Sequence, residues 1–188
     1  MGLHKNSSRE RWIELAKETI IKKGVEAINV DVMSKKLGVA KTSFYHFFNS
    51  KAEFLNMVFE KGIYDGTQAL ITKLSPVSDP KMRIKALIKV IFNENLKNEL
   101  FLRQLRTYGM HNKKIANLID TTEKQRISFL KGILLELDFD EVSAERRSSF
   151  FYIYTLGLYE RIYINPEILK DKERIYSSLR KILFAQEK

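Results

Sequence analysis

The sequence predicts an all-α fold. Apolar residues recur every three or four positions along most of the chain, and no segment shows the alternation of a half-buried strand. Turn-forming residues separate the periodic segments, at Gly24, Gly38, Pro76–Pro80, Gly109 and Asn165-Pro166. With 44% hydrophobic and 11% aromatic residues among 188, the chain has enough apolar surface for a packed core, which excludes disordered and collagen-like classes.

Three short helices are expected at the start of the chain. The first covers about 9–23 and ends at Gly24, which has no Cβ to oppose a left-handed stop. Asn29 is suited to cap a second helix that ends at Gly38. The third covers about 41–47. This pattern predicts a compact three-helix segment.

Longer helices are expected after residue 50. Ser50 and Glu53 form a capping-box pattern that opens a helix to about Leu74, with Gly62 and Gly66 weakening its middle. Asp79 and Pro80 suit the cap and first turn of the next helix. Further helices are expected over about 100–108, 114–137 and 142–164, and a final one is opened by Asn165-Pro166.

The last two helices are the most apolar part of the sequence. The run 150–159 is apolar on nearly all sides, so we expect its helix to be covered in every direction, by core and by a second copy of the chain. The final helix has a near-heptad repeat. The residues predicted at a dimer interface are Phe151, Gly157, Ile175, Leu179 and Ile182.

Positive charge is concentrated near the N-terminus. The net charge is +10 and the pI about 9.6. Residues 1–51 carry 10 Lys and Arg against 5 Asp and Glu, a net +5 that the other 137 residues only equal. A polyanion is therefore the expected partner.

Several classes of function are excluded by composition. The absence of Cys excludes disulfides, thiol catalysis and Cys-based metal sites, and the three His residues are widely separated. We expect no metal, no cofactor and no catalytic site, since no phosphate-binding loop or nucleophile motif is present. No apolar run reaches the roughly 18 residues of a membrane span, and the N-terminus lacks a secretory h-region, so we expect a cytoplasmic protein.

Two short helices joined at Gly38 inside the most basic segment suggest a helix-turn-helix, whose second helix enters the DNA major groove. Residues 33–51 read MSKKLGVAKTSFYHFFNSK, and this stretch resembles the DNA-binding signature of TetR-family transcription regulators. The first helix resembles that family as well, in Trp12, Ile13, Ala16, Ile20 and Gly24. The resemblance covers about residues 9–60 and implies a helix-turn-helix domain at 1–51, followed by a helical ligand-binding and dimerisation domain at 52–188.

The resemblance implies that Lys41 and Thr42, at the start of the recognition helix, face base edges. The side-chain chemistry agrees, because a lysine ammonium can donate to guanine O6 and N7. Phe44 and Phe48 are interpreted as core residues that pack on the first two helices.

Backbone contacts to DNA are implied for neighbouring residues. Tyr45 would contact the backbone or a base, and Ser43 and Lys51 would contact phosphates, Lys51 from a helix N-terminus that favours anions. His46 completes the predicted DNA-binding set, because its neighbour Phe47 has no polar atom to offer a phosphate.

A ligand pocket is implied by the resemblance alone. In this family the C-terminal domain encloses a small molecule, and the candidate lining residues here are Tyr108, Phe150, Tyr154 and Arg161. The many aromatic and aliphatic residues between Phe92 and Tyr163 favour an apolar or aromatic ligand.

We therefore expect a homodimeric, sequence-specific regulator that binds a palindromic operator in double-stranded DNA and acts as a repressor released by a small ligand. The alternative is a helical-bundle lipid carrier, small-molecule-binding protein or enzyme whose basic N-terminus binds anions nonspecifically. A third alternative is a nonspecific DNA-compacting protein, whose binding would depend on salt without discriminating between sequences.

Overall fold

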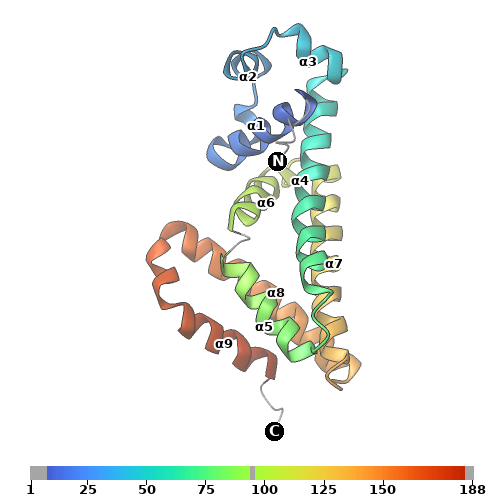
Figure 1. Cartoon of the computed structure of the whole chain (residues 1–188), viewed down its shortest axis with the longest axis vertical. Helices are drawn as coiled ribbons and strands as arrows, with labels where there is room; N and C mark the ends of the chain where they lie inside the picture. Colours follow the sequence, from blue (N-terminus) through green and yellow to red (C-terminus); the bar gives the residue numbers. More distant parts are fainter. Residues whose placement is uncertain (1–7, 94–95, 185–188) are drawn as a thin grey trace, which may run out of the picture. The chain divides into compact units, whose positions relative to one another are not determined.

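The computed structural model describes residues 8–93 and 96–184, and within them every regular element is helical, which confirms the predicted all-α fold (Figure 1). The α-helices are α1 (Ser8–Lys23), α2 (Val30–Leu37), α3 (Thr42–Phe47), α4 (Lys51–Leu74), α5 (Pro80–Asn93), α6 (Leu96–Gly109), α7 (Lys113–Leu135), α8 (Glu141–Ile164) and α9 (Lys172–Phe184). Two 3-10 helices, η1 (Val25–Ala27) and η2 (Pro166–Asp171), precede α2 and α9.

The chain divides into two compact units that do not follow a boundary at residue 51. The first unit is Met1–Asp65 with Leu100–Ile119, and the second is Gly66–Glu99 with Asp120–Lys188. The first unit extends beyond the three-helix segment because its apolar core also takes residues from α4, α6 and α7, among them Phe54, Val58, Phe101, Leu105 and Ile115. The boundary at residue 51 between a DNA-binding domain and a ligand-binding domain remains a prediction.

The caps and turns of the N-terminal helices follow the predictions. The side chain of Asn29 accepts hydrogen bonds from the backbone N–H groups of Asp31 and Val32, at 2.9 and 3.1 Å, and so caps α2. Gly38 ends α2 with φ at 68°, a left-handed conformation that suits glycine. Gly24 ends α1 with φ at 82°.

Phe44 places α3 on the rest of the first unit. Its side chain is fully buried, and its ring lies 5.2 Å from Trp12 and 5.1 Å from both Phe48 and Phe54, measured between ring centroids. These partners come from α1, the end of α3 and α4, so one aromatic side chain joins three helices. The same core includes the predicted contacts Ile13, Ala16 and Met33.

The two glycines inside α4 give room to neighbouring side chains. A Cβ at Gly62 would lie 2.4 Å from the ring of Phe101 in the first unit. A Cβ at Gly66 would lie 2.3 Å from the side chain of Asn98 in the second unit. Close approach therefore accounts for glycine at these positions, and α4 is continuous from Lys51 to Leu74.

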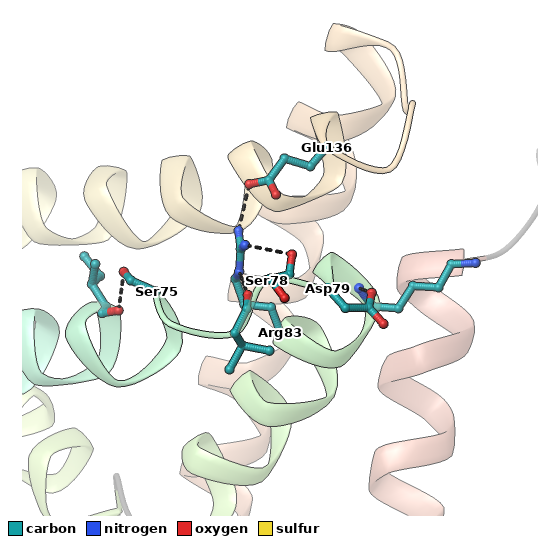
Figure 2. Close-up of polar contacts among 8 residues, drawn as sticks. Ser75, Ser78, Asp79, Arg83 and Glu136 are labelled. Carbon is teal, nitrogen blue, oxygen red and sulfur yellow. Dashed lines mark hydrogen bonds and ion pairs between the residues drawn. The ribbon is translucent and has the colours of Figure 1, made fainter.

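A cluster of polar contacts fixes the turn before α5 in the second unit (Figure 2). Asp79 caps α5 as predicted, accepting from the Lys81 N–H at 2.9 Å. The Arg83 guanidinium donates to the carbonyl of Val77 at 2.8 Å and to Glu136 of the α7–α8 connection at 2.7 Å. The turn is thereby tied to the end of α7.

Helix α8 has one buried and one exposed apolar face within the protomer, so the expected cover by a second copy of the chain remains a prediction. Asp140 caps the helix, and backbone hydrogen bonds, first from Ser143, lower the pKa of its carboxyl group. Phe151 is buried in the second unit, whereas Phe150 and Ile153 are 56% and 65% exposed.

The C-terminal segment is two helices where one was predicted. Asn165 caps the 3-10 helix η2 through the N–H of Glu167. Asp171 then accepts from the N–H of Arg174 at 3.3 Å, which gives α9 its own start. Ile175 and Leu179 of α9 are buried in the core of the second unit.

We predict that Phe44→Ala lowers the free energy of unfolding by about 3–5 kcal/mol, because it leaves a cavity in the aromatic core. Tyr45→Ala is the matched control on the same helix, since Tyr45 is 55% exposed, and should cost less than about 1 kcal/mol. Urea denaturation of both variants checks this difference. Equal losses of stability would contradict the role of Phe44.

Candidate functional site

The outer face of α3 gathers most of the polar residues singled out from sequence. Lys41, Thr42, Tyr45 and His46 are exposed, whereas Ser43 is half-buried. Positions 42, 45 and 46 share one side of the helix, and Phe44 lies on the opposite, buried side. Packing by Phe44 therefore determines which side chains α3 presents to solvent.

Lys41 is held by a carboxylate from the preceding helix. Its Nζ lies 2.9 Å from one oxygen of Asp31 and donates a hydrogen bond to the other at 3.1 Å. The hydrogen bond and the charge of Asp31 raise the pKa of Lys41. Both side chains are about half exposed, so the pair can separate at little cost. Sequence analysis did not identify this contact, because it depends on the angle between α2 and α3.

The start of α3 has no side-chain cap. Backbone hydrogen bonds occupy its first amides instead, from Ser43 to the carbonyl of Ala40 and from Phe44 to the carbonyl of Lys41, both at 3.0 Å. A six-residue helix closed in this way depends on tertiary packing for its stability.

Lys51 is placed by the start of α4 and is exposed. The hydroxyl of Ser50 accepts from the N–H of Glu53 at 3.1 Å, as the capping-box pattern predicts. The carboxylate of Glu53 accepts from Asn49 rather than from Ser50, at 3.2 Å. Lys51 therefore follows α3 on a fixed turn.

A cavity lies inside the second unit, between α4, α5, α7 and α8, with Glu99 at the start of α6. Its lining is largely apolar, with a few polar groups: Leu70, Leu87, Ile91, Glu99, Arg126, Phe129, Leu130, Ser148, Phe151, Tyr152, Thr155, Leu156 and Tyr159. Its volume is about 50 Å³, and by the same measure one buried water needs about 10–15 Å³. The cavity has room for a few non-hydrogen groups without rearrangement.

A buried ion pair forms the polar end of this cavity. Arg126 donates to Glu99 through Nη1 and to the hydroxyl of Thr67 through Nε, the latter at 3.2 Å. The side chains of Arg126 and Glu99 are only 8% and 3% exposed. Burial is the largest single effect and lowers the pKa of Arg126, but the charge of Glu99, its hydrogen bond, and Tyr152 and Tyr159 together outweigh it, and the pKa is raised. Sequence analysis did not identify this pair, whose members are 27 residues apart.

The four candidate ligand residues lie outside the lining of the cavity. Tyr108 packs on Phe59 in the first unit, with ring centroids 5.6 Å apart. Phe150, Tyr154 and Arg161 are exposed on α8. The lining uses the opposite face of that helix, because positions 151, 155 and 159 point into the core.

The residues predicted at the dimer interface are partly buried and partly exposed. Phe151, Ile175 and Leu179 are buried within the protomer, and Ile182 is half-buried. Gly157 is exposed, and a Cβ added there would have nothing within 4 Å. A surface for a second chain therefore cannot use the buried side chains of Phe151, Ile175 and Leu179, whereas Gly157 and Ile182 stay predictions.

The described residues hold neither a metal cluster nor a membrane-spanning helix. No cluster of His, Cys, Asp or Glu there has the arrangement of a metal site. No helix in that part of the chain is both long and apolar enough to cross a membrane.

Residues 13–58 match the family model described as "Bacterial regulatory proteins, tetR family". No curated protein matches the chain in sequence.

Solved structures of regulators have a similar fold over nearly the whole chain. The reduced form of NemR from E. coli is 18% identical, over 95% of this chain and 99% of that chain, with a TM-score of 0.79. A transcriptional regulator from Rhodococcus sp. Rha1 is 18% identical over 94% of each chain, with a TM-score of 0.77. A TetR transcriptional regulator from Legionella pneumophila is 18% identical over 94% and 98%, with a TM-score of 0.72. At these identities the similarity establishes the fold.

We predict that Arg126→Met destabilises the protein by about 3–5 kcal/mol, because it leaves the charge of Glu99 buried without its cation. Replacing both residues, as Glu99→Met with Arg126→Met, should restore most of that loss, since buried ion pairs are often replaceable by apolar residues of similar volume. Thermal denaturation of the single and double variants checks this. A double variant less stable than the single one would contradict the assignment.

Proposed function

We propose that this chain, which belongs to the TetR family of transcriptional regulators, is a repressor that binds one operator sequence through α3 and leaves it when a small ligand binds. The observation that carries the DNA-binding part is the exposed polar face of α3, inside the segment that matches the family model. This face belongs to the most basic part of the chain. An anion-binding carrier would not need a helix presented in this way.

Sequence reading is assigned to the first residues of α3. Lys41 and Thr42 are exposed there, and the major groove of B-DNA is wide enough to admit a helix whose N-terminal residues meet base edges. To reach a base, the Lys41 ammonium has to leave Asp31, which is 2.9 Å away. Asp31 therefore competes with DNA for the reading side chain.

Phosphate contacts are assigned to residues around the reading helix. Tyr45 and His46 are exposed on α3, and Ser43 is half-buried beside them. Lys51 is exposed at the N-terminus of α4, where the helix dipole favours an anion. Such contacts position the protein and supply salt-dependent affinity, but they do not read sequence.

Two copies of the chain would place two reading helices on one palindrome. Half-sites read by a helix-turn-helix dimer are about 34–36 Å apart, one turn of DNA. The exposed apolar face of α8 is the favoured surface for the second copy: Phe150, Ile153 and Gly157 follow one another at helical spacing and are all exposed. This set replaces the buried residues Phe151, Ile175 and Leu179.

Ligand release would act through the spacing of the two reading helices. A ligand that binds better to a conformation with another spacing shifts the population away from the DNA-bound state. The coupling is reciprocal, so operator DNA must weaken ligand binding by the same factor, typically 1–3 kcal/mol. The cavity of the second unit is the proposed ligand site.

The experiment that tests the function is selection of bound duplexes from a random pool. A regulator should enrich one palindromic sequence, with binding that also weakens steeply as salt rises. A nonspecific DNA-compacting protein would show the salt dependence without enrichment. Failure to enrich any sequence would overturn the proposal.

We predict that Lys41→Ala costs about 1–3 kcal/mol on the selected site and relaxes its specificity, whereas Lys51→Ala weakens all sequences similarly and lowers the salt slope by about one. Asp31→Asn removes the competing carboxylate and should tighten binding. Fluorescence anisotropy at several salt concentrations measures all three variants. If Lys41→Ala ranks operator sequences by affinity in the same order as the wild type, this lysine does not read bases.

We predict that Ile153→Arg gives a folded monomer with much weaker operator binding, because a charge replaces an exposed apolar residue of the α8 surface. Met82→Arg is the control, since Met82 is also exposed, on α5, and lies outside that surface. Sedimentation at micromolar concentration distinguishes the two variants. A wild-type chain that sediments as a monomer would overturn the dimer assignment.

A further inference from the structure

The cavity of the second unit contains a cation in apolar surroundings. The Arg126 side chain is 8% exposed and lines the cavity beside Phe129, Leu130 and Phe151. A guanidinium carries five N–H donors, and burying a donor without a partner is costly. The number of its donors that find partners therefore indicates what the cavity can bind.

One nitrogen of that guanidinium is unsatisfied. Nη1 donates to Glu99 and Nε donates to Thr67. Nη2 is buried and has no hydrogen-bond partner among the described residues. A molecule in the cavity with an oxygen acceptor at this point would satisfy it.

Other hydroxyl groups of the lining donate within the protein. Ser148 donates to the carbonyl of Glu145 at 3.0 Å, and Thr155 donates to that of Phe151 at 2.7 Å. Tyr159 donates to the carbonyl of Ile91 at 2.8 Å. These three groups therefore already have an acceptor, whereas Nη2 of Arg126 has none in the described part of the chain.

Charge balance narrows the ligand class further. Arg126 and Glu99 together are neutral, so an added carboxylate would leave a net negative charge in a buried apolar site, and an added ammonium a net positive one. A neutral oxygen acceptor satisfies Nη2 without either penalty. A hydrogen bond to a charged group is also stronger than one between neutral groups.

We propose that the cavity binds a small, neutral, mainly apolar molecule whose carbonyl oxygen accepts a hydrogen bond from Nη2 of Arg126. The volume of about 50 Å³ admits only a few non-hydrogen atoms, such as those of a short-chain ketone, since a cavity that holds a benzene ring measures about 150 Å³. The inference specifies the ligand class of the site used in the proposed function, and binding can be measured without DNA.

The experiment compares four probes of similar size with the full-length protein: 2-butanone, 2-methyl-1-butene, propionate and sec-butylamine. They share a short carbon chain and differ in acceptor and charge. Isothermal titration calorimetry should show 2-butanone binding about tenfold or more tighter than each of the others. Cyclobutanone is a second ketone with a cyclic body.

Two variants test whether the preference for the ketone depends on Arg126. The double variant with Glu99→Met and Arg126→Met removes both charges together, which avoids leaving one buried alone. It should bind 2-butanone and 2-methyl-1-butene within about twofold of each other. Arg146→Met is the matched control on exposed surface and should keep the wild-type preference.

Each outcome decides the proposal. It is wrong if neither ketone binds, if 2-methyl-1-butene binds as tightly as 2-butanone, if propionate or sec-butylamine is preferred, or if the double variant keeps the ketone preference. It is supported by a ketone preference that the double variant loses and Arg146→Met keeps. If 2-butanone then binds without releasing operator DNA, the ligand class stands and the ligand response of the proposed function fails.

Discussion

The burial of Phe44 is the constraint on which the proposed DNA-binding surface depends. Helix α3 has six residues and no side-chain cap, so local interactions alone would not keep it folded. The ring contacts from Phe44 to Trp12, Phe48 and Phe54 hold α3 against α1, which precedes it in the sequence, and against α4, which follows it. Because Phe44 points inward, Thr42 and Tyr45 point outward. The same packing therefore gives the helix its stability and its orientation.

The second unit combines an apolar core with one buried ion pair. Arg126 and Glu99 cost desolvation energy, and buried pairs of this kind can often be replaced by apolar residues of similar size at little cost in stability. A pair of this kind is therefore better explained by what it offers a bound molecule than by the stability it adds. The proposed ligand class depends on a single nitrogen atom of Arg126, which is buried in the cavity without a hydrogen-bond partner among the residues that the structure describes.

Charge has a different role in each unit. In the first unit, Lys41 and Asp31 form an exposed pair that solvent screens and DNA can displace. In the second, Arg126 and Glu99 are held in a low-dielectric environment where either charge alone would be costly. The exposed pair suits a reversible exchange of partners. The buried pair suits selection by charge neutrality and hydrogen bonding.

The sequence by itself determined the helices, most of their caps and the inward position of Phe44. These features depend on apolar periodicity and on caps and turns such as Asn29 and Gly38, whose interactions span only a few residues. Only the tertiary structure decided which face of α8 is buried, since a helix apolar all round carries no signal for its orientation. It also paired Lys41 with Asp31 and assembled the cavity. These arrangements depend on how distant helices cross, and no local pattern encodes a crossing angle.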